Sequence, residues 1–370
     1  MQFTPLGEEN PSRLILEQLN YHGALQVAPC LQRTEAAIKA ALAGAHGLLC
    51  RPNDGIEFSP SHLELAAKPF VVGTCSAGTD HLRQLEGLPD VTIVKSAGGN
   101  AAGVAELAIS HAMTLTRRLY AAERAMEMGL YEAPPGTRIE GKHWLVIGAG
   151  QQAVQLIAKA ASLGVAGFTV YHDQMNDAKL IACVRMVPSE LIQVTEGAPM
   201  RIKTSVKTWM TVAGTNALDE AIPQADIISL HVPARAADPL SGRPATEGMV
   251  NREFLALTKS RCFIINVARG SLVHERAVID WLLAHSECGF ASDVLDQRAE
   301  RQRDPSLSVL HQEFMRSESL RDPRKRLNLV LTPHIGGSAL EDFHDVCQEV
   351  LDKVLTELRI VIPAAMRRSI

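Results

Sequence analysis

The most constraining feature of this sequence is a series of short, continuous apolar runs separated by segments with helical spacing. The runs lie at 25–28, 47–50, 70–75, 91–94, 144–147, 168–171, 227–230, 263–266, 290–292 and 329–331. Runs that are apolar throughout are typical of parallel strands buried on both faces. Helical patterns lie between many of them, for example at 152–163 and 274–284. The sequence therefore predicts a layered α/β fold.

Length and helix spacing indicate more than one domain. A chain of 370 residues predicts two or three domains at about 150 residues each. Two longer helical patterns bracket the second series of runs, one at 102–118 and one that starts at Ser338, where Glu341 completes a capping-box pattern. The segments 176–204 and 297–326 fit the α/β alternation poorly, and we expect each to be a surface insertion.

Charge and cysteine usage exclude several classes of protein. Lys and Arg number 37 against 41 Asp and Glu, so a net charge of −4 gives no reason to expect a nucleic-acid partner. No apolar run approaches the roughly 18 residues of a membrane span, and residues 1–13 do not resemble a signal peptide. The 7 cysteines are widely spaced without a C-x-x-C pair, which predicts no disulfide framework, no metal site and a cytoplasmic location.

A glycine-rich turn is the most informative local motif. Gly148, Gly150, Gln151, Gln152 and Ala153 form a G-x-G-x-x-A pattern between a predicted strand and a predicted helix. The first glycine permits a tight turn, the second permits close approach of a pyrophosphate, and the helix N-terminus favours phosphate charge.

An acidic residue follows this motif at the expected distance. Asp173 lies about 20 residues further on, at the end of the next strand, where a carboxylate can accept the hydroxyls of a ribose. Because the same carboxylate would repel a 2′-phosphate, the pattern predicts NAD rather than NADP. A glycine-rich turn without a ligand remains the alternative interpretation.

Three polar residues follow the predicted strands at their carboxyl ends, where open α/β sheets bind ligands. Arg269 offers a planar fork that suits a carboxylate, and His334 offers a proton that titrates near neutral pH. Asp293 ends the strand between them. Taken singly, Arg269 could be a surface ion-pair partner and His334 an ordinary loop histidine.

Several motifs in order resemble one enzyme family. The segments 73–81, 100–106, 225–233, 266–273 and 332–337 are similar to those of D-isomer-specific 2-hydroxyacid dehydrogenases. The resemblance implies a Rossmann-type NAD-binding domain at 118–335, inserted into a flavodoxin-like substrate (catalytic) domain made of 1–117 and 336–370. It also implies a homodimer.

The resemblance also implies roles for individual residues. Arg269 would orient the carboxylate and carbonyl of the substrate, His334 would pass the proton, and Asp293 would lie beside the nicotinamide. The turn of Ser76, Ala77, Gly78 and Thr79 would offer backbone N–H groups to the substrate carboxylate, although a simple tight turn is the alternative. The residues implied to border the cofactor are His231, Val232, Pro233, Asn266, Val267, Ala268 and Gly336.

The sequence departs from the family at one catalytic position. The family has a glutamate-proline pair five residues after the matching aspartate, whereas this chain has Arg298 there. Asp296, Glu300 and Asp304 could replace that glutamate as the partner of His334. Glu300 is favoured because it keeps the longer side chain. Asp304 would restore an acid-proline pair if 298–303 were an insertion. A third alternative is that none of these carboxylates pairs with His334.

These observations predict an NAD-dependent enzyme that interconverts a small 2-oxo acid and its D-2-hydroxy acid. Two alternatives remain open. One is an NADH-sensing binding protein of the same fold, which the displaced glutamate favours. The other is a dehydrogenase for a phosphorus-containing substrate, which the arginine-rich segment 297–326 would suit.

Overall fold

The chain divides into two compact units. A computed structural model describes residues 34–50, 56–131, 135–187, 189–194, 198–203, 209–237, 244–320, 322 and 325–358. One unit comprises Met1–Asn100 with Gly337–Ile370, and the other comprises Ala101–Gly336. The strand predicted at 25–28 lies outside the described residues.

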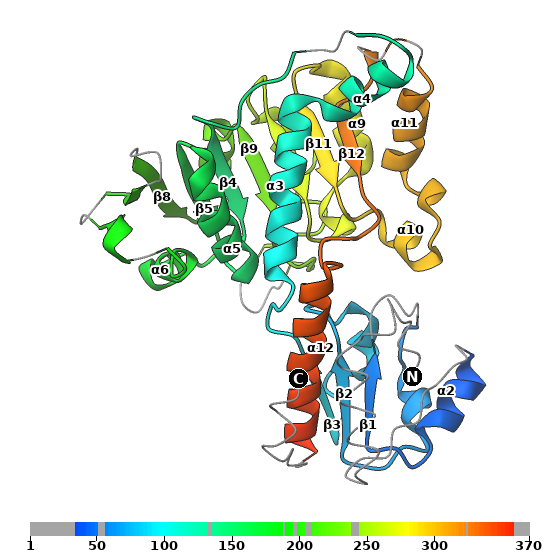
Figure 1. The fold of residues 1–370 in the computed structure, drawn as a ribbon. Coiled ribbons are helices and arrows are strands. Elements are labelled where there is room, and N and C mark those ends of the chain that lie inside the picture. Colours follow the sequence, from blue (N-terminus) through cyan, green and yellow to red (C-terminus); the bar gives the residue numbers. More distant parts are fainter. Residues whose placement is uncertain are drawn as a thin grey trace. The chain divides into compact units, whose positions relative to one another are not determined.

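The larger unit contains a mostly parallel sheet in the order β12-β11-β10-β9-β4-β5-β8-β7-β6 (Figure 1). Its strands are β4 (His143–Ile147), β5 (Gly167–Tyr171), β6 (Ile192–Gln193), β7 (Met200–Lys203), β8 (Trp209–Thr215), β9 (Ile227–Leu230), β10 (Phe263–Asn266), β11 (Gly289–Ser292) and β12 (Leu329–Leu331). From β8 to β12 all pairs are parallel, and only β7 and β6 extend the edge in antiparallel fashion. The chain order reverses direction at β4 and β9, which is where such sheets bind nucleotides.

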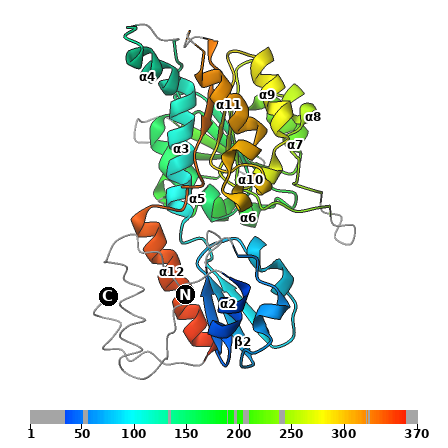
Figure 2. The same cartoon turned by 90° about the vertical axis from the view of Figure 1, so that its right-hand side faces the viewer.

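Both faces of this sheet are covered by helices, which explains the continuous apolar runs. On β4, Trp144 and Val146 belong to the apolar cluster of one face, whereas Leu145 and Ile147 belong to that of the other. All four side chains are fully buried. Figure 2 shows α3 and α9 on opposite sides of the sheet. The α/β class with a doubly covered parallel sheet is therefore confirmed.

One domain boundary differs from the expected one. The helices of the larger unit are α3 (Ala101–Arg117), α4 (Leu119–Glu127), α5 (Gln151–Ala160), α6 (Asp177–Cys183), α7 (Leu218–Ala221), α8 (Arg252–Ala256), α9 (Glu275–Ala284), α10 (Gln297–Gln302) and α11 (Val309–Glu318). We expected α3 to fall in the substrate domain, which was to end at 117. It groups with the larger unit because Ala105, Ala108 and Ala112 are small enough to pack it closely into the cluster shared with α5.

The two segments expected as surface insertions contribute to the core of the larger unit. Cys183, Met200 and Ile202 are buried in the cluster that also contains α5. Strand β8 has no continuous apolar run, so the sequence did not predict it. In the second segment, Leu310 of α11 is buried against α9 and its neighbours.

The smaller unit is a three-stranded parallel sheet in the order β1-β2-β3. Its elements are α2 (Glu35–Leu42), β1 (Gly47–Cys50), β2 (Phe70–Thr74), β3 (Val91–Lys95) and α12 (Leu340–Glu357). Phe70 and Val72 pack with α2, whereas Val71 packs on α12. The capping box expected at Ser338 is wrong, because the backbone stays extended through Ala339, which is the N-cap and forms no side-chain hydrogen bond.

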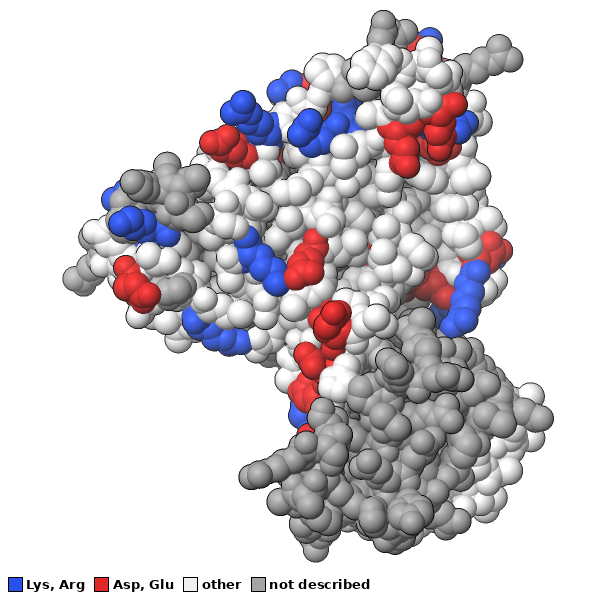
Figure 3. All heavy atoms as spheres, in the orientation of Figure 1, with Lys and Arg blue, Asp and Glu red and all other residues white. Residues whose placement is uncertain are grey.

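Several further properties follow from the described residues. The six cysteines among them form no disulfide bonds, and none of the described helices is long and apolar enough to cross a membrane. No group of three His, Cys, Asp or Glu side chains in this part of the chain is placed to hold a metal ion. On the described part of the face in Figure 3, basic and acidic side chains are interspersed.

Candidate active site

The glycine-rich loop joins β4 to α5, as the sequence predicts. Gly148 has a φ of +121°, and a Cβ added there would lie 2.5 Å from the carbonyl oxygen of His231. Gly150 is the N-cap of α5 with a φ of −89°, and a Cβ added there would meet nothing within 4 Å. Protein packing therefore requires a glycine at 148 but not at 150. The open space before the helix N-terminus fits the pyrophosphate of a dinucleotide.

Asp173 lies beside this loop. The N–H of Gly148 donates to the carbonyl oxygen of Tyr171 at 2.9 Å, which ties the loop to the end of β5. The Asp173 side chain is 9% exposed and contacts Arg235 Nη2 at 2.6 Å. The carboxylate expected to bind a ribose therefore has a cationic partner that sequence reasoning missed.

His231 links the loop after β9 to the first turn of α5. Its Nδ1 lies 3.0 Å from Gln152 Oε1, and its Nε2 lies 3.0 Å from Ser229 Oγ. Trp144 Nε1 donates to the same Ser229 oxygen at 2.9 Å. Burial lowers the pKa of His231 to about 3, so the ring is neutral and serves to order the loop. Gln151, Val232 and Pro233 flank these residues.

Arg269 is positioned by a buried amide. Asn266, the last residue of β10, is fully buried. Its Nδ2 donates to the carbonyl oxygen of Arg269 at 2.9 Å, and its Oδ1 accepts from the N–H of Ala268 at 3.1 Å. Val267 and Ala268 are themselves buried. The Asn266 amide thus fixes the turn from which the half-buried Arg269 side chain extends.

His334 lies on a turn held by Asp293. The Asp293 carboxylate is buried and accepts from Thr332 Oγ1 at 2.6 Å, from the N–H of Ile335 at 2.9 Å and from the N–H of Gly336 at 2.8 Å. The N–H of His334 donates to the Asp293 carbonyl oxygen at 2.8 Å. His334 has a φ of +57°, an uncommon conformation that such a network can maintain.

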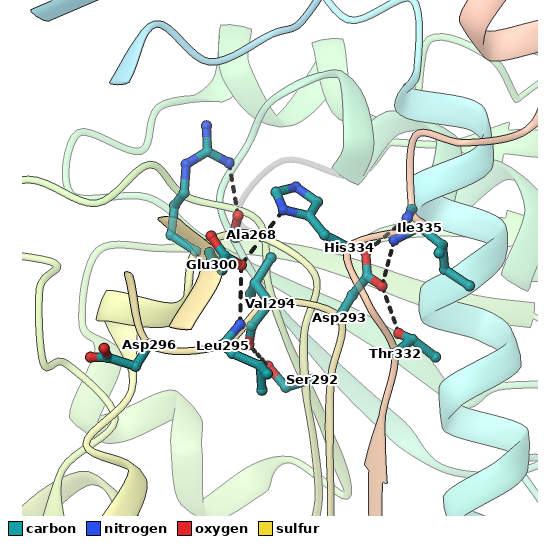
Figure 4. A network of polar contacts seen from close by, with 12 residues as sticks. Ala268, Ser292, Asp293, Val294, Leu295, Asp296, Glu300, Thr332, His334 and Ile335 are labelled. Atoms are coloured by element: carbon teal, nitrogen blue, oxygen red, sulfur yellow. Dashed lines mark hydrogen bonds and ion pairs between the residues drawn. The ribbon is translucent and has the colours of Figure 1, made fainter. Parts of the chain in front are cut away.

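The imidazole of His334 faces Glu300 (Figure 4). Its Nδ1 lies 3.5 Å from Glu300 Oε1, and the same oxygen accepts from the N–H of Leu295 at 3.1 Å. The Glu300 carboxylate raises the pKa of His334 above its ordinary value, while desolvation and the charge of Arg269 act in the opposite direction. Such a pair suits a histidine that donates a proton near neutral pH.

The other two candidate carboxylates serve as helix caps. Asp296 Oδ1 accepts from the N–H of Arg298 at the start of α10, and in Figure 4 its side chain points away from His334. Asp304 Oδ1 accepts from the N–H of Ser306 at 3.0 Å. Because α10 begins at Gln297, Glu300 lies one helical turn further on and returns toward His334.

The turn 76–79 belongs to the smaller unit and follows β2. Ser76 Oγ donates to the Gly78 carbonyl oxygen at 2.6 Å, and Thr79 Oγ1 donates to Glu86 Oε1 at 2.9 Å. Within the part of the chain that the structure describes, the N–H groups of Ala77, Gly78 and Thr79 have no hydrogen-bond acceptor. This turn can therefore offer donors to an anionic group.

Comparison with known proteins relates part of the larger unit to one enzyme family. Residues 192–336 match the family model "D-isomer specific 2-hydroxyacid dehydrogenase, NAD binding domain". Among curated proteins, D-3-phosphoglycerate dehydrogenase of Methanocaldococcus jannaschii is 25% identical over 88% of this chain and 51% of its own length. Its counterpart from Escherichia coli K12 is 27% identical over 77% of this chain and 57% of its own. The chain thus spans about half the length of these relatives.

Solved structures share the fold at lower identity. The holo form of D-mandelate dehydrogenase from Rhodotorula graminis aligns with a TM-score of 0.69 at 19% identity, covering 95% of this chain and 91% of that one. D-lactate dehydrogenase from Aquifex aeolicus, solved with NAD and lactic acid, aligns with a TM-score of 0.63 at 18% identity, covering 87% and 85%. Residues 192–336 of the larger unit are thus similar to the NAD-binding domain of the D-isomer-specific 2-hydroxyacid dehydrogenases, and the solved structures share the fold.

Proposed function

We propose that this chain is an NAD-dependent dehydrogenase that interconverts a small 2-oxo acid and its D-2-hydroxy acid. The observation that carries the proposal is the contact of His334 with Glu300 at 3.5 Å in the family's NAD-binding domain. Bound NAD would supply the hydride chemistry. The open space at Gly150, the N-terminus of α5 and Asp173 would hold its phosphates and ribose.

Residues that follow β10, β11 and β12 would bind the substrate and transfer the proton. His334 Nε2 would donate a proton to the carbonyl oxygen of the 2-oxo acid, and Glu300 would hold the ring and favour its protonated form. Arg269 would bind the substrate carboxylate through its planar guanidinium. Asp293 would act as a positioning residue, because its carboxylate contacts the turn of His334.

A panel of 2-oxo acids, followed by NADH absorbance, tests this assignment. We expect His334→Gln to lower kcat by about 10²–10⁴-fold, and Arg269→Lys to lower kcat/KM while NADH binding is kept. Arg252→Lys is the matched control, because Arg252 is an exposed arginine paired with Asp280. A protein that binds NADH but reduces no 2-oxo acid would instead be a cofactor-sensing binding protein.

A phosphorylated substrate is the second candidate. It is supported by the curated relatives named D-3-phosphoglycerate dehydrogenase, which are 25–27% identical to this chain. The panel should therefore contain phosphorylated and unphosphorylated acids of the same carbon skeleton. A kcat/KM that is higher for the phosphorylated member by about tenfold or more, or about 1.4 kcal/mol, would select this substrate class.

A homodimer is proposed as the assembled form. Exposed apolar side chains on and after α4 support it, among them Leu119 at 48%, Met126 at 61% and Tyr131 at 93% exposure. Such side chains in one stretch favour association. Light scattering during size-exclusion chromatography measures the mass, and a protein that stays at the 40.1 kDa monomer mass at micromolar concentration contradicts the proposal.

A further inference from the structure

The carboxylate expected to select NAD is neutralised by an arginine. Arg235 Nη2 donates to Asp173 Oδ2 at 2.6 Å, and His172 Nδ1 lies 3.0 Å from Oδ1. The Asp173 side chain is 9% exposed and that of Arg235 is 24% exposed. Because the pair is partly withdrawn from water, its two charges are screened less by solvent and largely cancel each other.

The backbone of Arg235 is fixed by a neighbouring buried threonine. The N–H of Arg235 donates to Thr246 Oγ1 at 2.9 Å, and that hydroxyl donates to the Pro233 carbonyl oxygen at 2.7 Å. Arg235 Nε donates to the Pro244 carbonyl oxygen at 3.2 Å. Among the residues with described structure, Arg235 Nη1 has no hydrogen-bond partner. The guanidinium is thus held beside Asp173, and Nη1 is the donor group that no described residue engages.

The charge balance decides whether a 2′-phosphate is tolerated at this point. A phosphate monoester carries about −1.5 to −2 charges at neutral pH, and an unpaired carboxylate next to it would repel it. Here the nearby carboxylate is paired with a guanidinium, which is the side chain best suited to bind phosphate. Asp219 is the other carboxylate that acts on neighbouring Tyr171, and it is exposed, so water and salt screen it.

We propose that Arg235 determines cofactor choice and that the site accepts NADPH as well as NADH. Arg235 would cancel the charge of Asp173 and donate to the 2′-phosphate, whereas Asp173 would still accept the ribose hydroxyls of NADH. The proposal rests on the dinucleotide site of the proposed function. It revises the expectation from the sequence, which favoured NAD over NADP because of the Asp173 carboxylate.

Binding titrations of NADH and NADPH to the full chain, followed by fluorescence of the reduced nicotinamide, test the proposal at two salt concentrations. We expect the wild-type protein to bind the two with dissociation constants within about tenfold of each other. Arg235→Gln should weaken NADPH binding by about tenfold or more while NADH binding changes by less than about threefold. Arg252→Gln, at an exposed and distant ion pair, is the control.

A second variant, Asp173→Asn, keeps the test informative if Arg235→Gln fails to fold. Asp173→Asn removes the repelling charge and leaves Arg235 in place, so NADPH should bind at least as tightly as to wild type while NADH binds more weakly. The inference is overturned if wild type binds NADPH more than about 100-fold more weakly than NADH, or if Arg235→Gln weakens both equally. If wild type binds neither dinucleotide, the proposed function itself fails and this inference with it.

Discussion

Gly148 and Gly150 stand in the same loop, but a side chain should have opposite consequences at the two positions. In Gly148→Ala the Cβ would lie 2.5 Å from the His231 carbonyl oxygen and 2.9 Å from its carbon, at a φ of +121°. Backbone strain of about 1–3 kcal/mol and overpacking of about 1–3 kcal/mol add to a loss of about 2–6 kcal/mol. We expect the free energy of unfolding of the larger unit to fall by that amount.

Gly150→Ala should leave the fold intact and impair cofactor binding. Its φ of −89° is allowed for any residue, and the added Cβ has no neighbour within 4 Å. We expect a change in the free energy of unfolding of about 1 kcal/mol or less, from the altered N-cap alone. NADH binding should weaken by about tenfold or more, because the methyl group occupies the space assigned to the pyrophosphate.

Denaturant titration gives the free energies of unfolding, and calorimetry gives the NADH affinities. In addition, NADH at about 100 times its dissociation constant should stabilise wild type by about 2.7 kcal/mol, and the same concentration should stabilise Gly150→Ala much less. Gly141→Ala is the control for positive φ without a steric contact, because Gly141 has a φ of +74° and no neighbour within 4 Å of an added Cβ.

Two results would refute this reasoning. Unchanged NADH affinity in Gly150→Ala would mean that the loop does not face the pyrophosphate. A loss of stability in Gly150→Ala as large as in Gly148→Ala would mean that the open space before α5 does not exist in solution.

Three further predictions concern the polar network. Glu300→Gln removes the carboxylate that raises the pKa of His334. In the pH profile of kcat/KM for reduction, the fall in rate with rising pH should therefore occur at lower pH. An unchanged profile, or an equal shift in Asp296→Asn, would contradict the pairing of His334 with Glu300. Asn266→Ala removes the hydrogen-bond partner of the Arg269 carbonyl and of the Ala268 N–H at a fully buried position. The free energy of unfolding should therefore fall by about 2–4 kcal/mol. A loss below about 1 kcal/mol in denaturant titration would show that the amide is dispensable. Burial lowers the pKa of His111 from 6.5 to about 4, so on acidification the unfolded chain binds a proton before the folded chain does. The free energy of unfolding should therefore decrease by about 3 kcal/mol in all as the pH falls from about 6.5 to about 4. His111→Gln should flatten this part of the profile of stability against pH, and an unchanged pH dependence would be evidence against a buried neutral ring.

Local patterns were sufficient for most strands and for the nucleotide loop. The apolar runs at 144–147, 227–230 and 263–266 correspond to β4, β9 and β10, because a strand buried on both faces needs apolar residues throughout. The strand β8 was missed because it mixes small, polar and apolar residues, and only its place beside β5 buries it. Strands were thus predictable from the sequence where the residues form a continuous apolar run.

Placement in three dimensions decided what local patterns left open. Glu300, Asp296 and Asp304 were all candidate partners of His334, and only the course of α10 directs Glu300 to the ring while the other two cap helices. The assignment of α3 to the larger unit likewise depends on which helix its alanines contact. Neither the partner of His334 nor the unit to which α3 belongs can be predicted from the spacing of residues along the chain.

The chain by itself indicated most of the elements, the glycine turn and the polar residues at the strand ends, since these depend on neighbours in sequence. The tertiary structure decided the electrostatics of the site, since these depend on which groups meet across the fold. Asp173 and Arg235 are 62 positions apart, and no local pattern joins them. An isolated aspartate repels a phosphate, whereas an aspartate paired with an arginine has its charge largely cancelled, although the local sequence is the same in both cases.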